Sequence, residues 1–505
     1  MAITFDTFPS YRRASMRAIE LKGKKKSISG DYIPERVLIV GQFDPAKTSV
    51  VEGAAVQCLT ADAVGDTFGY GFELHRQAIK IFDALGGYSD NVWCAAVPVP
   101  SSSAQATGTI TFTGDATSAG TFFVSIAGEL YQVGVVSGAT DDEIAAALVA
   151  LITADVAAPV TAAVGGTGSE NIVTITAKDY GVNGNDIRLV LNPDGTSQSD
   201  QNPSGPTVAL SAARLASGTG NPDVSSVFIA SDDSDNLGDR WYTLITMPYR
   251  DSTAIASYKA ALTARVAPEP NRVCGAVCGY VNKTYAEALA IPATINSKFI
   301  APVWDSRSLA PDCEFGAAVL GMVAYYATLD PGRPFMGCEV GVASLEGLDP
   351  VYSQLDALFR AGMGYCKQLS DGTLVAGDLA LSYRTNTAGA ATEEWYDIVS
   401  LTRRQVMTYQ MEQVFKSDPY IRGMVGSDDI VTSKDYVIKP KTVVSDLYRL
   451  VDNWASEGWV KNPDDIKATI SAEINASNES RIDATITSDE AKALRIIALQ
   501  AAFLY

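Results

Sequence analysis

The sequence predicts a multidomain protein of the α/β and α+β classes, in which helices cover a mixed central sheet and a mainly-β domain is inserted. Three observations support this prediction. Strand patterns alternate with amphipathic helix patterns in two stretches of the chain, a Thr- and Gly-rich segment separates the two stretches, and longer helices and a hairpin follow. The 505 residues are also enough for two to four domains.

The α/β pattern begins with residues 36–43 (RVLIVGQF), which read as a buried strand. Residues 72–85 (FELHRQAIKIFDAL) follow as an amphipathic helix, and residues 91–99 (NVWCAAVPV) as a second buried strand. The alternation resumes later with the strands WYTLITMPY, RVCGAVCGYV and KFIAPVW and the helix STAIASYKAALTARV. Such alternation is typical of a mostly parallel sheet covered by helices. We therefore assign residues 31–100 and 221–345 to an α/β body.

Residues 101–220 interrupt this body and differ from it in composition. They contain no Cys, Trp, Met or His, and they carry short strand patterns such as TGTITFTG, TFFVSIAG and NIVTITA. One helix pattern, DDEIAAALVALITA, begins at Asp141. Three basic and eleven acidic residues give the segment a net charge of −8. The sequence therefore predicts an inserted, outward-facing, β-rich domain with its own fold.

Residues 346–493 are expected to form an α+β domain at the carboxyl-terminal end. The segment contains three helix patterns, VYSQLDALFRAGM, YDIVSLTRRQVMTYQMEQVF and VVSDLYRLVDNWASEG, and a tight turn at Asp371 and Gly372. Residues 466–488 then show two alternating runs joined by the polar NASNES, which predicts a hairpin.

Both ends of the chain have an unusual composition. The first thirty residues, the expected amino-terminal arm, carry seven basic residues against two acidic ones behind the strand-like ITFDTF. Residues 494–505 (LRIIALQAAFLY) are almost entirely apolar, although chain ends are normally polar unless something holds them. An extended segment can add to the sheet edge of a neighbouring copy. The basic arm has two readings, an electrostatic clasp between copies or a solvated tail.

The chain lacks the residue patterns of common catalytic and metal sites. His75 is the only histidine, so a His-rich metal site or a hydrolase triad is not expected. Cys274 and Cys278 have no second cysteine pair at zinc spacing and read as core thiols. The SDDSDNLGDRW stretch departs from a calcium loop at Leu237. Gly41 stands alone rather than in a dinucleotide-binding motif. We expect no enzyme activity, no cofactor and no metal.

The overall charge and the cysteine pattern exclude further classes. A net charge of −19 argues against nucleic-acid binding, which needs a basic face. Seven scattered cysteines indicate assembly in a reducing compartment rather than a disulfide framework. The longest uncharged helix pattern, FGAAVLGMVAYYATL, is too short to cross a bilayer, and no secretory signal is expected.

Several segments, in this order along the chain, resemble the contractile tail sheath proteins of Mu-like bacteriophages. They are ITFDTFPSYRR, RVLIVGQF, VWCAAVPVP, GTGNPD, WYTLITMPYRD, IVTSKDYVIKPKTVVSDLYRLVDNWASEGWVKNPDDIKATI and RIDATITSDEAKALRIIALQAAFLY. The resemblance spans nearly the whole length. It implies a subunit of stacked hexameric rings around a tail tube, which contract to drive the tube through the host envelope. It further implies baseplate and tail terminator partners, assembly in the bacterial cytoplasm, and a final location in the virion tail.

The resemblance also implies where the subunits contact each other. Residues 346–493 would be an inner assembly domain, completed by terminal strands that adjacent copies exchange, and residues 494–505 would be the strand given to a neighbour. The expected strand contacts are Ile3, Phe5, Phe8, Ile470, Ile474, Ile482, Ile486, Leu494, Ile496, Leu499, Phe503 and Tyr505. The expected electrostatic arm residues are Arg12, Arg13, Arg17, Lys24, Lys25 and Lys26.

Two alternative functions can be formulated. A secreted or surface-layer adhesin would explain the β-rich insert, but it is disfavoured by the missing signal and the unpaired cysteines. A nucleotide-binding α/β enzyme is disfavoured because the chain has no phosphate loop and no acid/base set.

Overall fold

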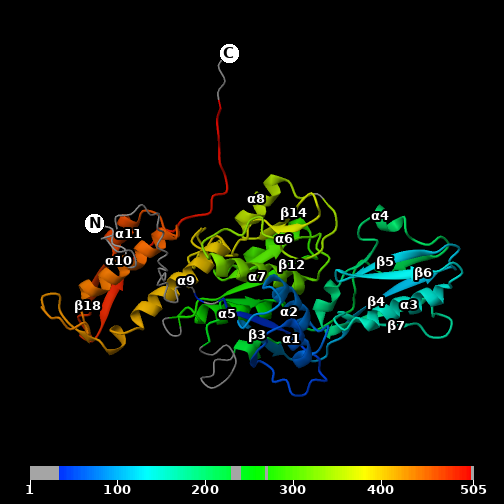
Figure 1. Cartoon of the computed structure of the whole chain (residues 1–505), viewed down its shortest axis with the longest axis horizontal. Coiled ribbons are helices and arrows are strands. Elements are labelled where there is room, and N and C mark those ends of the chain that lie inside the picture. Colours follow the sequence, from blue (N-terminus) through cyan, green and yellow to red (C-terminus); the bar gives the residue numbers. More distant parts are fainter. Residues whose placement is uncertain (1–32, 34, 229–239, 268–270, 348, 502–505) are drawn as a thin grey trace, which may run out of the picture.

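A sheet of eight strands forms the centre of the molecule (Figure 1). The computed structural model describes residues 33, 35–228, 240–267, 271–347 and 349–501. In spatial order the strands are β15 (Leu374–Ala376), β14 (Gly364–Gln368), β13 (Ile300–Trp304), β12 (Gly275–Tyr280), β11 (Leu244–Thr246), β1 (Val37–Gln42), β3 (Val92–Val97) and β2 (Ala55–Gln57). The strands from β14 to β3 run parallel, and the two edge strands are antiparallel to their neighbours. The expected mixed sheet of an α/β protein is therefore confirmed.

The central strands are buried on both faces because helices cover them. All residues of β1, β3, β12 and β13 are buried, as their continuous apolar sequences predict. The covering helices are α1 (Ala61–Phe68), α2 (Glu73–Ala84), α5 (Ser252–Ala264), α6 (Tyr285–Ile295), α7 (Asp312–Leu329) and α8 (Tyr352–Ala361). Helix α7 is almost wholly buried and packs against β11, β12 and α2.

Helix α7 lies unusually close to β12 because two glycines meet there. A Cβ atom on Gly279 would lie 2.3 Å from the Asp312 carbonyl oxygen, and one on Gly316 would lie 2.8 Å from the Gly279 nitrogen. Neither distance is compatible with a side chain, so both positions require glycine for this backbone contact.

The inserted segment folds around a core of its own (Figure 1, cyan to green). One sheet has the order β10 (Thr207–Leu210), β4 (Gln105–Thr113), β8 (Ile172–Tyr180), β7 (Val160–Val164), and the other has the order β6 (Glu129–Val135), β5 (Gly120–Ile126), β9 (Leu189–Leu191). Helix α3 (Asp141–Ala154) packs against this core, and the short α4 (Thr196–Ser199) and η1 (Val182–Asp186) complete the region. The short η2 (Ser225–Phe228) packs against β3 and α5 of the body. Side chains in β4 and β8 alternate between buried and more exposed positions, the pattern of half-buried strands.

A buried ion network joins the insert to the body. The Arg76 guanidinium on α2 contacts the carboxylate of Asp179, at the end of β8, and that of Glu314 on α7. All three side chains are at most 6% exposed. A second arginine, Arg250, donates to Asp186 of the insert at 2.5 Å and pairs with Asp312 of α7. Because buried charges must be compensated, these contacts fix the insert against the body.

Hydrogen bonds reinforce this joint around Glu73 at the start of α2. The Gln42 side chain donates to the Tyr180 carbonyl oxygen at 2.6 Å and accepts from the Tyr180 nitrogen at 3.0 Å. The Asn183 amide donates to the Glu73 carboxylate at 2.7 Å, and the Tyr249 hydroxyl donates to its other oxygen. Among the described residues, the Glu73 carboxylate at this joint is held by neutral hydrogen-bond donors rather than by an ion pair.

Replacing Glu73 with Gln is expected to stabilise the chain, relative to the unmodified protein, increasingly as the pH rises from about 5 to about 8. Burial, and then repulsion from Asp179, raises the pKa of Glu73 from 4.5 to about 7. The folded chain therefore holds this proton more tightly than the unfolded chain. The resulting stabilisation is complete below about pH 4.5 and is lost as the pH rises through about 7.

Thermal unfolding of both proteins at pH 5.5 and pH 8 measures this effect. Burial also raises the pKa of Glu35 to about 7, so only the difference between the two proteins isolates Glu73. We expect that difference to change by roughly 1 to 3 kcal/mol across the range. A difference that does not vary with pH would contradict the assignment.

The carboxyl-terminal region lies on the opposite side of the body from the insert (Figure 1). Its elements are α9 (Ile398–Phe415), η3 (Tyr420–Arg422), β16 (Met424–Val425), β17 (Val437–Ile438), α10 (Pro440–Ser456), α11 (Pro463–Thr469), β18 (Ser471–Ile474) and β19 (Ile482–Thr485). Helix α10 packs against α9, α11 and the β18–β19 hairpin. The predicted hairpin is present, with Ile474 opposite Ile482.

The central sheet extends beyond the boundary that the sequence predicts at residue 345. Strands β14 and β15 follow that boundary, yet β14 pairs with β13 of the body and β15 pairs with β14. The chain therefore continues to build the central sheet after residue 345. The sequence pattern could not show this, because the sequence of a strand does not specify which strand it pairs with. The other domain limits stay predictions. In the described part of the chain, no helix is both long and apolar enough to span a membrane.

Candidate assembly surface

An apolar groove opens in the carboxyl-terminal region between the β18–β19 hairpin and the β16–β17 sheet. Its volume is about 350 Å³. Its lining side chains come from several elements and are mostly apolar: Phe415, Tyr420, Met424, Val425, Ile438, Val443, Ile482 and Ala484, together with Gly423 and Ser480. Met424 is 63% exposed. Exposed apolar side chains gathered around a groove indicate a contact site for a further protein segment.

Two small sheets with unpaired edges flank this groove. Strand β16 pairs with β17, and β18 pairs with β19; among the described residues neither pair has a third strand. Two-stranded sheets are only marginally stable alone, and their free N–H and C=O groups can bind an additional strand. The region therefore offers backbone hydrogen-bonding groups beside apolar side chains.

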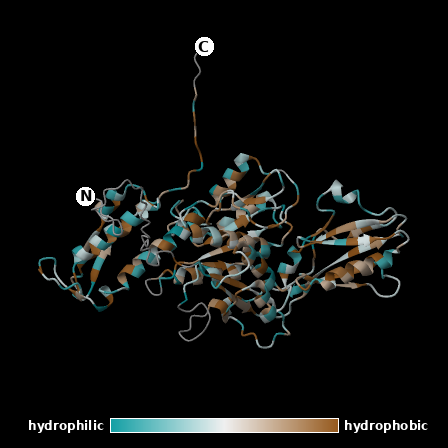
Figure 2. Cartoon of the chain, viewed as in Figure 1, coloured by the Kyte–Doolittle hydropathy of each residue, from teal (hydrophilic) through white to brown (hydrophobic). Residues whose placement is uncertain are grey.

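The last described residues carry apolar side chains that are exposed to solvent. Residues 496–501 extend away from the rest of the described chain (Figure 1, red), and Figure 2 shows hydrophobic residues along this segment. Ile496, Ile497 and Leu499 are 69%, 80% and 88% exposed. Exposure of several large apolar side chains in succession is unfavourable in water by about 25 cal/mol for each Å² left uncovered.

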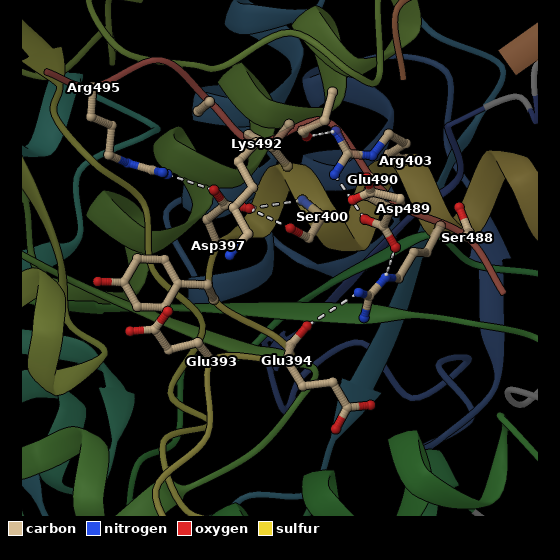
Figure 3. Close-up of a pocket in the computed structure, with 15 residues that line it drawn as sticks. Glu393, Glu394, Asp397, Ser400, Arg403, Ser488, Asp489, Glu490, Lys492 and Arg495 are labelled. Atoms are coloured by element: carbon tan, nitrogen blue, oxygen red, sulfur yellow. Dashed lines mark hydrogen bonds and ion pairs between the residues drawn. The ribbon is translucent and has the colours of Figure 1, made fainter. Parts of the chain in front are cut away.

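A cluster of charged residues holds the chain just before this segment (Figure 3). The Glu490 carboxylate accepts from Arg403 at 2.8 Å and from Arg404 at 2.5 Å, both on α9. Arg403 also donates to the Ala491 carbonyl oxygen at 2.7 Å. The Ala491 nitrogen in turn donates to the Trp459 carbonyl oxygen at 2.8 Å. Residues 490 and 491 are thus fixed by both side-chain and backbone contacts.

Arg495 forms a second set of contacts five residues further on. Its guanidinium donates to Asp378 at 2.8 Å and to Asp397 at 2.5 Å, and it lies 4.6 Å from the centre of the Phe359 ring. Asp397 also caps α9 by accepting from the Ser400 nitrogen. Although burial alone would raise it, hydrogen bonds from Ser400 and Arg495 hold the pKa of Asp397 below its usual value. The Asp397 carboxylate is therefore ionised at neutral pH.

The structure places the predicted strand-contact residues in two separate groups. Ile470 is buried, and Ile474, Ile482 and Ile486 are partly buried in and beside the hairpin. Leu494, Ile496 and Leu499 are exposed, and among the described residues no strand pairing joins them to the hairpin. Their predicted roles between subunits stay predictions.

The remaining predicted contact residues lie outside the described part of the chain. These are Ile3, Phe5, Phe8, Phe503 and Tyr505, and the arm residues Arg12, Arg13, Arg17, Lys24, Lys25 and Lys26. The calcium-loop-like stretch around Asp233 is also outside the described ranges.

Sequence reasoning missed two parts of this region. The groove residues Tyr420, Met424 and Val425 follow the end of α9 in a stretch without a clear period, so only their apolar character could have drawn attention to them. Arg495 offered a clearer signal, because it is one of the few charged residues in the apolar end of the chain.

The single histidine is buried and contributes to packing. His75 is buried on α2, its Nδ1 accepts from the Gly71 nitrogen at 3.1 Å, and its ring packs edge-on against Tyr70. Burial lowers the pKa of His75 to about 4, so the ring is neutral at physiological pH. Cys274 and Cys278 are fully buried, as expected for core thiols.

The sequence is similar along its whole length to a curated tail sheath protein. It is 26% identical over 506 residues to the Mu-like prophage FluMu tail sheath protein of Haemophilus influenzae, an alignment that covers 99% of both chains. No protein-family model matches the sequence. That relative is a tail sheath protein, in agreement with the expectation that this chain is not an enzyme. The resemblance to the tail sheath proteins of Mu-like phages is therefore confirmed.

Solved structures of sheath proteins are similar at a lower level. The sheath tail protein of Desulfitobacterium hafniense matches with a TM-score of 0.46 and 10% identity over 94% of this chain and 100% of its own. The anti-feeding prophage sheath in its contracted state matches with a TM-score of 0.47 and 11% identity over 99% of each chain. TM-scores below 0.5 do not establish a shared fold.

Proposed function

We propose that this chain is the subunit of a contractile phage tail sheath. The subunits form stacked hexameric rings around a tail tube, and contraction of the array drives the tube through the host envelope. The partners are other copies of the chain, the tube protein, and the baseplate and tail terminator proteins. The chain assembles in the host cytoplasm and ends in the virion tail.

One observation carries the proposal beyond sequence similarity. The chain presents an exposed apolar segment, residues 496–501, and also an apolar groove flanked by free strand edges. A segment and a groove of matching chemistry on one chain allow each copy to bind the next. Because the same contact can repeat from copy to copy, it produces a polymer rather than a closed pair.

Contraction in this proposal needs no cofactor. An extended array that is metastable can shorten when each subunit exchanges a weaker interface for a stronger one. The terminal strands stay bound to their neighbours throughout, so the array remains connected while the bodies rotate. The inserted domain, on the side of the body away from the groove, faces outward.

Negative-stain electron microscopy of the purified protein tests this function directly. Hollow, striated cylinders are expected on concentration of the protein. Discrete globular particles at all concentrations would contradict the sheath proposal and favour an adhesin-type or enzymatic protein instead.

Replacing Lys24, Lys25 and Lys26 with Gln is expected to weaken polymerisation at low salt more than at high salt. These lysines belong to the basic amino-terminal segment of a chain whose net charge is −19. Surface attraction between opposite charges is largely screened beyond about 10 Å at 0.1 M salt. Light scattering during polymerisation at about 0.02 M and 0.5 M salt measures the effect. An identical salt dependence in both proteins would show that the basic segment is not a clasp.

A further inference from the structure

Along residues 489–501, contacts with the subunit stop abruptly. Up to Arg495 the segment is held by ion pairs, backbone hydrogen bonds and ring contacts with its own subunit. The Leu494 side chain is already 70% exposed, and from Ile496 to the last described residue every residue is exposed. Arg495 is thus the last described residue that an ion pair fixes to its own subunit.

We infer that the contacts of Glu490 and Arg495 form a clamp, which fixes the point where the carboxyl-terminal segment leaves its own subunit and makes Ile496 the first residue of the free segment. The role of the neighbour rests on the proposed function. The clamp itself is a property of the single subunit. It shortens the expected donated strand, 494–505, by two residues.

The two halves of the clamp attach to preorganised groups. Asp397 is held in place by its cap on α9, and Asp378 accepts from the Tyr365 hydroxyl at 2.9 Å. Arg403 is almost fully buried, with Glu490 across from it. Ion pairs of partly buried groups are screened by salt much less than exposed pairs. The clamp is therefore expected to stay closed under the salt conditions that weaken the amino-terminal contact.

The position of the clamp limits how far the free segment can reach. The ten residues from Ile496 to Tyr505 span at most about 33 to 36 Å when fully extended. Opening the Arg495 contacts would release the chain back to Ala491 and add four residues, or about 13 to 14 Å. A neighbour's groove that moved beyond the first limit would have to open the Arg495 half of the clamp. The clamp thus holds a reserve of chain length.

The clamp also reduces the conformational entropy that the free segment loses when it binds to a neighbouring subunit. A segment that starts from a fixed point samples fewer positions than one that starts several residues earlier, so binding to a neighbour loses less conformational entropy. Arg495 is accordingly a positioning residue for assembly, not a contact residue.

Limited trypsin digestion of the full-length, unassembled protein tests the clamp without reference to assembly. Cleavage after Lys492 requires the chain between Glu490 and Arg495 to open. In Arg495→Gln and Glu490→Gln we expect this cleavage to be at least about fivefold faster than in the unmodified protein. Arg481→Gln removes a surface ion pair with Asp483 in the same region and serves as the matched control, with a rate within about twofold. Equal rates in all four proteins would overturn the clamp.

Assembly of the same variants tests the positioning role. Arg495→Gln is expected to raise the protein concentration needed for cylinder formation at least about fivefold, with the melting temperature within about 2 °C of the unmodified protein. Faster digestion with an unchanged assembly concentration would overturn the positioning role. If the unmodified protein forms no cylinders, the proposed function fails, while the digestion result still decides whether the clamp exists.

Discussion

A chain that ends at Ile496 is expected to remain a folded monomer that no longer polymerises. The truncation removes Ile497, Leu499, Phe503 and Leu504, whose full burial would contribute roughly 1.5 to 3 kcal/mol each before the cost of ordering the segment. A loss of even 4 kcal/mol weakens a contact by a factor of about 10³. The fold is expected to be intact because Ile497 and Leu499 are largely exposed on the subunit.

Sedimentation velocity measures the loss of polymerisation, and circular dichroism measures whether the fold is intact. The truncated chain should sediment as a monomer at concentrations where the full chain forms cylinders, with an unchanged helix signal. Gln500→Ser in the full chain is the control, since it alters a polar residue of the same segment and should polymerise normally. Cylinders formed by the truncated chain would exclude the apolar segment as the joint between subunits.

Replacing Arg76 with Ala is expected to destabilise the subunit by roughly 3 to 5 kcal/mol. The guanidinium lies between the carboxylates of Asp179 and Glu314, and all three side chains are buried. Without it two acidic groups remain in a poorly solvated interior without their shared counter-charge. Because Asp179 belongs to the insert, we expect the packing of the insert against the body to loosen before the body itself unfolds.

Urea unfolding followed by tryptophan fluorescence measures the change. The insert contains no tryptophan, so this signal reports the body and the carboxyl-terminal region, and limited proteolysis of the 101–220 segment reports the insert. Arg422→Ala is the matched control, because Arg422 pairs with Asp418 on the surface and its removal should leave the stability nearly unchanged. A similarly small change for Arg76→Ala would mean that the buried network is not what joins the two parts.

Sequence patterns predicted the positions of helices and strands better than they predicted which strands pair with each other. Residues 36–43 and the helix pattern ending at Phe415 closely match β1 and α9, because hydrophobic periodicity is a local property. The predicted start of α3 at Asp141 is correct, but the residue that caps it is Thr140, in a capping box with Glu143. Strand β14 joined the body sheet although its sequence does not distinguish that sheet from another.

The candidate site could be predicted only in part for a similar reason. The apolar end of the chain and the hairpin are visible in the sequence, since each is continuous along it. The clamp is not, because Arg403 and Glu490 are separated by 87 residues. The groove likewise collects side chains from elements between Phe415 and Ala484. Contacts across such distances depend on how the helices pack, which single-sequence patterns do not specify.

The buried joint has a consequence for engineering the outer domain. The insert leaves and rejoins the body at adjacent points, since Ala104 pairs with Thr219, so its geometry invites replacement by an unrelated cargo domain. Such a replacement would remove Asp179 and Asp186. Each guanidinium would keep one carboxylate of α7, Glu314 for Arg76 and Asp312 for Arg250. A graft should therefore keep both arginines, because neutral replacements would leave the two carboxylates of α7 buried without a counter-charge.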